Sequence, residues 1–90
     1  MLEFNAETLT LSENGVECNF SLTELRVTNL LNLNFGEVVS RKKLDTLWNA
    51  VVGYRTVDVH IKRIRSKLTE HDIVSAHGKG YMLIEKGHEV

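Results

Sequence analysis

The sequence Arg55-Thr56-Val57-Asp58-Val59-His60-Ile61-Lys62-Arg63-Ile64-Arg65-Ser66-Lys67-Leu68 decides the fold of this 90-residue chain. Four of its apolar residues recur at helical spacing and lie within an arc of roughly 60° on a helical wheel: Val57, Ile61, Ile64 and Leu68. This is the clearest amphipathic pattern in the chain. We therefore predict a helix from about Thr56 to Leu68 that packs one apolar stripe against a core.

The opposite side of the predicted helix is polar and almost uniformly basic. From Arg55 to Lys67 there are five basic residues and one acid, a local charge of +4 that leaves −5 for the rest of a chain with net charge −1. An α-helix fits the major groove of DNA, where long basic side chains can reach guanine edges or phosphates. The alternative is a solvated basic face that only keeps the protein soluble. The outward residues are Arg55, Thr56, Val59, Lys62, Arg63, Ser66 and Lys67.

Individual positions on this face have different expected roles. Arg63 lies nearest its centre. An apolar side chain such as Val59, turned away from the core, would be favoured beside a thymine methyl group. His60 borders the core, so a hydrogen bond at the core edge and a phosphate contact both remain open.

The flank of the helix holds its single acid. Asp58 lies in the first turn, where a negative charge is favoured, and it can pair with Lys62 four residues later. Arg65 lies on the side of Asp58, and three roles remain open for it: a contact to phosphate, a pairing with Asp58, or a pairing with an acid elsewhere in the body of the domain.

Two further helices are predicted before this one. The first spans residues 22–33, with Ser21 or Thr23 as its N-cap and Gly36 as its stop signal. The second begins after Ser40 and ends at Gly53. Its apolar residues follow the spacing of one helical stripe: Leu44, Leu47, Trp48 and Val51.

Strand-like runs occupy both ends of the chain. Asn14-Gly15 favours a tight hairpin turn between residues 8–11 and 16–20, with Phe4 on a third short strand. Gly78-Lys79-Gly80 joins two further runs, residues 73–77 and 81–84. The predicted fold is therefore α+β, with an antiparallel sheet, three helices and a C-terminal hairpin. Lys79 at the tip is either a solvated charge or, together with His77, a contact to an adjacent minor groove.

Length and composition predict one domain over residues 1–90. Hydrophobic residues make up 42% and charged residues 26%, and no apolar run approaches the roughly 20 residues that span a membrane. The first residues lack the features of a secretory signal, so we expect a cytoplasmic protein. The single Cys18 cannot form an internal disulfide, and burial must stabilise the fold.

Enzymatic sites are not expected. The four histidines lack the spacing of zinc ligands, and Cys18, predicted to lie on a strand, has no base near it. No glycine-rich phosphate loop is present. We expect no catalytic residue, metal or cofactor, and we predict surface or helix-flank positions for His60, His71, His77 and His88.

The chain resembles the OmpR/PhoB-type winged helix-turn-helix effector domains of two-component response regulators. Four stretches carry the resemblance, and together they cover nearly the whole chain: 20–25 (FSLTEL), 36–41 (GEVVSR), 55–68 (RTVDVHIKRIRSKL) and 77–81 (HGKGY). The resemblance implies a recognition helix at 56–68 and a wing at 73–84. The receiver domain that precedes such modules is absent from these 90 residues.

The resemblance also implies roles for single residues. It places Arg55, His60, Lys62, Arg63 and Arg65 on the major groove and phosphates, Trp48 on the backbone, and Ser75, His77 and Tyr81 on the wing side. We rank Arg63, Lys62 and Val59 highest for base contacts. Departures from the family pattern are Thr28 and Asn32 in the first helix, and His77 and Lys79 in the wing.

We therefore predict sequence-specific binding of double-stranded DNA for transcription regulation. Expected partners besides DNA are a second copy of the chain, on DNA or in the full-length protein, and RNA polymerase, which the family contacts through the loop at 49–54. The alternative function is a protein interaction module whose basic helix docks on an acidic partner.

Overall fold

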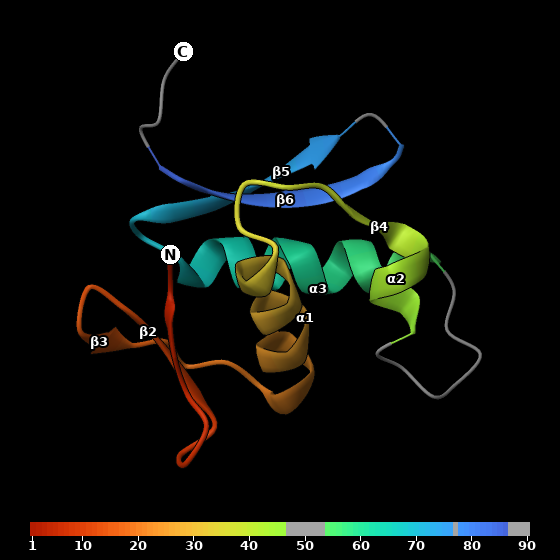
Figure 1. Cartoon of the computed structure of the whole chain (residues 1–90). Helices are drawn as coiled ribbons and strands as arrows, with labels where there is room; N and C mark the ends of the chain where they lie inside the picture. The colour runs from red at the N-terminus through yellow and green to blue at the C-terminus, as the bar shows by residue number, and fades with distance from the viewer. Residues whose placement is uncertain (47–53, 77, 87–90) are drawn as a thin grey trace.

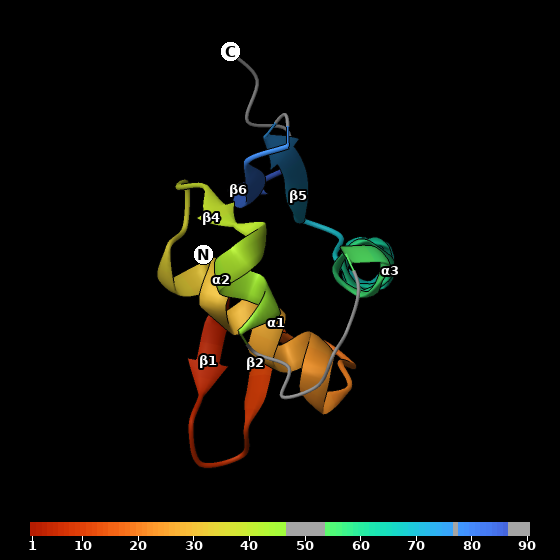
Figure 2. The same cartoon turned by 90° about the vertical axis from the view of Figure 1, so that its right-hand side faces the viewer.

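The computed structural model describes residues 1–46, 54–76 and 78–86, with only the backbone for residues 54–56. Two three-stranded sheets lie on opposite sides of a layer of helices (Figure 1). Figure 2, in which α3 is seen end-on, shows the same layering from the side. The elements follow the predicted order, apart from β4, which was not predicted: β1 (Glu3–Asn5), β2 (Thr10–Glu13), β3 (Val16–Glu17), α1 (Leu22–Leu33), β4 (Val39–Ser40), α2 (Arg41–Asp45), α3 (Tyr54–Lys67), β5 (His71–Ala76) and β6 (Gly80–Glu85).

The N-terminal sheet has the order β1-β2-β3 and is antiparallel throughout. Asn14 and Gly15 have φ angles of 50° and 82°, which a tight hairpin turn requires of both central residues. The predicted turn is therefore confirmed, and so is a third strand that contains Phe4.

The strands of this sheet differ from the predicted runs, because β2 lies two residues later than residues 8–11 and β3 is shorter than residues 16–20. Leu9 has a φ angle of 54°, which is incompatible with an extended strand, and β2 begins only at Thr10. The prediction that Cys18 lies on a strand is wrong, because β3 ends at Glu17. Beyond that point the chain turns towards α1, and the Phe20 amide donates to the Cys18 carbonyl over 3.1 Å.

Helix α1 begins with a reciprocal capping box. The Ser21 hydroxyl accepts from the Glu24 amide over 3.2 Å, and the Glu24 carboxylate accepts from the Ser21 amide over 2.9 Å. The amides of Ser21 and Glu24, which have no partner within the helix, thereby each gain a hydrogen bond. Of the two predicted caps, Ser21 is the one used. The helix ends at Leu33, and Gly36 follows with a φ angle of 78°.

Asn32, one of the departures from the family pattern, joins α1 to the start of the chain. Its Oδ1 accepts from the Leu2 amide and its Nδ2 donates to the Leu2 carbonyl, both over 2.9 Å. Asn32 and Leu2 are each only 3% exposed. The Asn32 side chain thus provides both hydrogen bonds that the buried backbone of Leu2 would otherwise need from a neighbouring strand.

Replacement of Asn32 by leucine is expected to lower the free energy of unfolding by about 2 kcal/mol, because the buried amide and carbonyl of Leu2 would lose their partners. Urea denaturation followed by circular dichroism measures the change. Asn29→Leu, one turn earlier on the same helix at a half-buried position, is the matched control. Equal losses in the two variants would contradict the proposed role of Asn32.

Helix α2 is positioned by the second sheet. This sheet has the order β4-β6-β5, with Val39 opposite Tyr81 and Ser40 opposite Gly80. Ser40 then caps α2, as predicted, by accepting from the Lys43 amide over 3.1 Å. Leu44 is fully buried. The rest of the predicted apolar stripe, from Leu47 to Val51, and its stop at Gly53 lie outside the described residues.

The core lies between α3, α1 and both sheets. The predicted stripe of α3 is confirmed, since Val57 and Ile64 are fully buried and Ile61 and Leu68 are at most 4% exposed. Leucines from β2 and α1 and residues from β5 and β6 complete the cluster. Among the described residues, no helix has the length and apolar character needed to cross a membrane.

Candidate nucleic-acid interface

The outward face of α3 carries free basic side chains around an exposed valine. Lys62 and Arg63 are exposed, and Val59 is 45% exposed. The Ser66 hydroxyl donates to the Arg63 carbonyl over 2.6 Å, so it is occupied within the helix. The side chains of Arg55 and Thr56 lie outside the described part of the structure. Lys62, Arg63 and Val59 therefore share the face that the sequence assigned to bases.

Two other basic residues of α3 are bound within the domain. Arg65 donates from Nε to the Ile73 carbonyl over 2.6 Å and lies 3.6 Å from the Asp72 carboxylate. Arg65 therefore turns towards Asp72, an acid in the body of the domain, which was one of the alternatives left open for this residue. Lys67 Nζ lies 2.6 Å from Oε1 of Glu24, a residue only 3% exposed.

The Glu24–Lys67 pair is part of the way α3 docks on α1. Burial raises the pKa of Glu24, but the hydrogen bonds from Lys67 and from the Ser21 amide outweigh it, and the pKa is lowered overall. Glu24 is therefore ionised when it holds Lys67. A phosphate contact by Lys67 would have to compete with this ion pair or share the ammonium group with it.

Asp58 has a different partner from the one predicted. Its Oδ1 lies 2.8 Å from Nη1 of Arg41, and no ion pair between Asp58 and Lys62 occurs among the described residues. The prediction is wrong because β4 and the start of α2 bring Arg41 beside the first turns of α3. Lys62 is exposed on the outward face and has no ion-pair partner within the described part of the chain. No role was predicted for Arg41, although it directly follows the Ser40 cap and ends one of the stretches that carry the family resemblance, residues 36–41.

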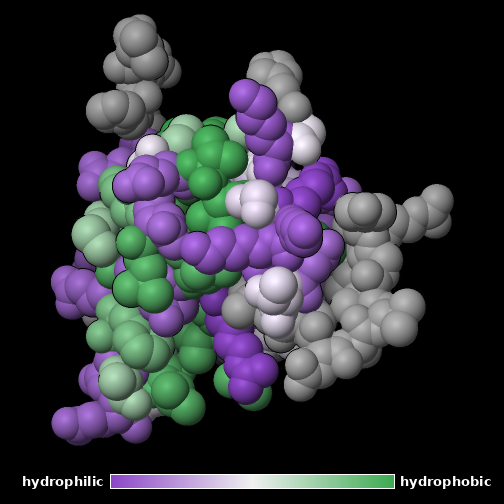
Figure 3. All heavy atoms as spheres, turned by 45° about the vertical axis from the view of Figure 1, so that its right-hand side comes forward, coloured by the Kyte–Doolittle hydropathy of each residue, from purple (hydrophilic) through white to green (hydrophobic). Residues whose placement is uncertain are grey.

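The wing presents two of its predicted residues and buries a third. Ser75 on β5 and Lys79 in the turn are exposed, and Gly78 allows the turn with a φ angle of 76°. These residues belong to a side of the molecule, near α2 and the wing turn, where hydrophilic residues gather, whereas hydrophobic ones are more frequent towards the N-terminal sheet (Figure 3).

The third predicted wing contact, Tyr81, is only 6% exposed. Its hydroxyl donates to Asp58 and accepts from Nη2 of Arg41 over 3.2 Å.

The remaining predicted contacts are Trp48, His77 and His60. Trp48 and His77 lie outside the described residues. His60 is half-buried at the edge of the α3 stripe, as its place on the helical wheel predicts. No group of three or more His, Cys, Asp or Glu side chains within the described ranges could hold a metal ion.

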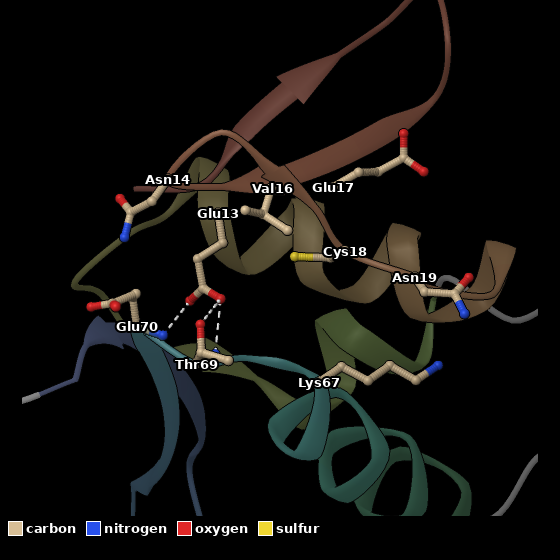
Figure 4. Close-up of a pocket in the computed structure, with 9 residues that line it drawn as sticks. All are labelled: Glu13, Asn14, Val16, Glu17, Cys18, Asn19, Lys67, Thr69 and Glu70. Atoms are coloured by element: carbon tan, nitrogen blue, oxygen red, sulfur yellow. Dashed lines mark hydrogen bonds between the residues drawn. The ribbon is translucent and has the colours of Figure 1, made fainter.

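The prediction of a surface or helix-flank position is wrong for His71. This residue is 5% exposed, and its Nδ1 lies 2.8 Å from Oε2 of Glu13, which is equally buried. The Glu13 carboxylate also accepts from the amides of Thr69 and Glu70 (Figure 4). A carboxylate on β2 thus holds the connection between α3 and β5, which carries His71 into the interior.

Comparisons with known proteins agree with this geometry. A model for the family described as "Transcriptional regulatory protein, C terminal" matches residues 15–83. The chain belongs to this family. The response regulator DrrB of Thermotoga maritima, an OmpR/PhoB homologue, has the same fold with a TM-score of 0.80 and 33% identity, over 92% of this chain and 41% of DrrB. The resemblance to OmpR/PhoB-type effector domains is thereby confirmed, as is the winged-helix fold.

Curated relatives and other structures extend the comparison. RegX3 of Mycolicibacterium smegmatis is 34% identical over 91% of this chain and 40% of its own length. TorR of Escherichia coli K12 is 34% identical over 88% of this chain and 36% of its length. The chain thus spans well under half of these relatives. The DNA-binding domain of CpxR from E. coli matches with a TM-score of 0.80 and 25% identity, over 93% of this chain and 90% of that domain.

Proposed function

We propose that this member of the family binds double-stranded DNA sequence-specifically and thereby regulates transcription, with α3 in the major groove and the wing at the adjacent minor groove. The observation that carries the proposal is the exposed face of α3. It presents Lys62, Arg63 and the apolar Val59, while the acid on its flank is neutralised by Arg41. A face of this kind can contact phosphates and base edges together.

The predicted DNA contacts can be ranked by whether each side chain is exposed or already bound within the domain. Arg63 and Lys62 are free to meet guanine edges, and Val59 is free to meet a thymine methyl group. Ser75 and Lys79 are exposed on the wing and can reach the backbone or the minor groove. Arg65 and Lys67 already have intramolecular partners, so phosphate contacts from them are the weaker part of the proposal.

The partners and the location of this chain are proposals. One structural relative, the AdeR DNA-binding domain, was solved in complex with an intercistronic region. For this chain we propose two copies on paired half-sites, as a winged helix of this size covers only a short sequence. The cytoplasmic location and the contact with RNA polymerase stay predictions. Residues 49–53 of the loop that the family uses to contact RNA polymerase lie outside the described residues.

Selection of bound duplexes from a random-sequence pool tests the proposed function. At about physiological salt we expect enrichment of a repeated short half-site. The affinity for the best site should then fall with salt at a slope of roughly −4 to −5 in log K against log salt, if about five phosphates are neutralised at about −0.9 each. A slope near zero at measurable affinity would exclude insertion into a groove.

Arg63→Ala separates base recognition from simple charge. This variant should lose about 1–3 kcal/mol of discrimination at one position of the half-site, the usual effect of a lost bidentate base contact. Arg26→Ala removes the same charge from an exposed position on α1 and should leave the sequence preference unchanged. Loss of an acidic protein partner by Arg63→Ala, with DNA binding intact, would support the interaction-module alternative instead.

A further inference from the structure

Three side chains from separate elements meet between the wing and α3. Arg41 is the first residue of α2, Asp58 lies on α3, and Tyr81 lies on β6. Oδ1 of Asp58 lies 2.8 Å from Nη1 of Arg41 in an ion pair, and it accepts a hydrogen bond from the Tyr81 hydroxyl. Nη2 of Arg41 donates to the same hydroxyl over 3.2 Å. Each member of the cluster therefore contacts both of the others.

The cluster is more constrained than an ordinary surface ion pair. The Arg41 guanidinium carbon lies over the Tyr81 ring, 5.2 Å from its centre, which is within the range of a cation–π contact. Tyr81 is 6% exposed, and the Arg41 side chain is 27% exposed. An isolated exposed pair contributes little to stability. A planar fork bound to two partners at once instead restricts orientation.

The position of the cluster links the wing to the residues proposed to contact bases. Tyr81 and its neighbour Gly80 pair with β4, which leads directly into α2. Asp58 immediately precedes Val59 and lies one helical turn before Lys62. The Tyr81 hydroxyl thus joins β6 to α3 beside the proposed recognition surface. A rotation of the wing relative to α3 would break these hydrogen bonds.

The cluster also determines the charge at this edge of the interface. An unpaired carboxylate beside Val59 would repel the phosphates of DNA. Arg41 neutralises Asp58 from the side of α2, while Tyr81 remains a donor. Burial raises the pKa of Tyr81, and its hydrogen bond to Asp58 raises it further. The hydroxyl therefore keeps its proton at neutral pH.

This inference rests on the DNA-binding function proposed above. We propose that Arg41, Asp58 and Tyr81 are positioning residues that hold the wing and α3 at one mutual orientation, and so determine discrimination among DNA sequences. Tyr81 then acts through Asp58 and not by touching DNA. Loss of the cluster lowers the affinity for the preferred site more than the affinity for random DNA, because only the preferred site requires both elements in register.

A double-mutant cycle tests the proposal on Tyr81→Phe, Asp58→Ala and the combined variant. The phenylalanine keeps the ring beneath Arg41 and removes only the hydroxyl, and Asp58 is 47% exposed, so folded protein is expected in each case. Thermal unfolding by circular dichroism checks this. The measured quantity is the ratio of the affinity for the best selected site to that for random duplex, at one salt concentration.

Coupling between the two residues is the expected result. Tyr81→Phe should lower the ratio about 5- to 10-fold in the wild-type background and less than about 2-fold when Asp58 is already alanine, since residues in one network are not additive. An equal loss in both backgrounds, or an unchanged ratio in the wild-type background, would overturn the positioning role. A wild-type ratio near one would instead reject the sequence specificity of the proposed function, on which this inference rests.

Arg41→Lys provides a second test that preserves charge. Lysine cannot reproduce the planar fork that joins Asp58 and Tyr81, so the ratio should fall while the salt slope stays unchanged. Lys42→Ala, at the adjacent exposed position of α2, removes a charge but no member of the cluster and should leave the ratio intact. If Lys42→Ala lowers the ratio as much as Arg41→Lys does, the cluster has no special role.

Discussion

Replacement of Gly80 by alanine is expected to lower the free energy of unfolding by about 3 kcal/mol, the upper end of the usual cost of overpacking. A Cβ atom at this position would lie 1.9 Å from the Val39 carbonyl oxygen and 2.8 Å from the Ser40 Cα. Both are backbone atoms of β4, so no side-chain rotation relieves the clash. Strand β4 would have to separate from β6, and the pairing that positions the start of α2 would be lost.

Gly78→Ala is the matched control for this experiment. Gly78 lies in the same wing turn, has a φ angle of 76°, and has open space where a Cβ would lie. Alanine there meets only the backbone cost of a left-handed conformation, about 1 kcal/mol. Urea denaturation at neutral pH compares the two variants with the wild type. Equal losses would show that close approach of β4 does not restrict Gly80.

The difference between the two glycines shows what the sequence could predict. Both belong to a Gly-Lys-Gly motif that indicates a turn, and the turn is where the motif places it. The role of Gly80 depends instead on β4, some forty residues earlier in the chain. Val39 and Ser40 carry no local signal of that pairing. Local patterns therefore located the wing, but not the contact that restricts one of its glycines.

The same distinction holds for α3 and its charges. The apolar spacing of Val57, Ile61 and Ile64 predicted which side of the helix is buried, because helical periodicity is a local property. It could not predict which basic residues remain free. Arg65 and Lys67 find their partners on β5 and α1, and such tertiary pairs are not encoded in the spacing of one helix. Lys62 and Arg63 are exposed, and the acid nearest to Lys62 on this helix, Asp58, is paired with Arg41 of α2.

Buried polar residues were the other weak point of sequence-based prediction. Histidine is often found on surfaces, so His71 was expected there, yet the hydrogen bonds of Glu13 make its burial tolerable. Asn32 likewise stands where the family usually has an apolar residue, and its burial is explained by its two hydrogen bonds to Leu2. In both cases the partner lies more than twenty residues away. Composition and periodicity contain no information about which distant residue will hydrogen-bond to a buried polar side chain.

The buried carboxylate of Glu13 is expected to make stability strongly dependent on acid. Burial alone would raise the pKa of Glu13, but hydrogen bonds from the Thr69 amide, His71, the Glu70 amide and the Thr69 hydroxyl lower it from 4.5 to about 2. The unfolded chain therefore takes up this proton at a higher pH than the folded chain does. The resulting stabilisation, about 3 kcal/mol, is complete above pH 5 and is lost as the pH falls from about 5 to about 2.

Glu13→Gln should remove this acid-dependent part of the stability. Its amide group must face either the donors of Thr69 or those of Glu70 and His71, since one glutamine oxygen cannot replace two carboxylate oxygens. We expect a loss of about 3 kcal/mol at pH 7, because hydrogen bonds to a charged acceptor are lost. Towards pH 2 the difference from the wild type should shrink. Urea denaturation at a series of pH values measures both effects.

Glu17→Gln, at an exposed position on β3 of the same sheet, removes the same charge and should change the stability by no more than about 0.5 kcal/mol. Parallel pH curves for the wild type and Glu13→Gln would contradict the assigned role of Glu13. Convergence in acid would instead show that this carboxylate, through the amides of Thr69 and Glu70, fixes the connection that follows α3. The orientation of α3 would then depend on an ionised group at the end opposite to Arg41 and Asp58.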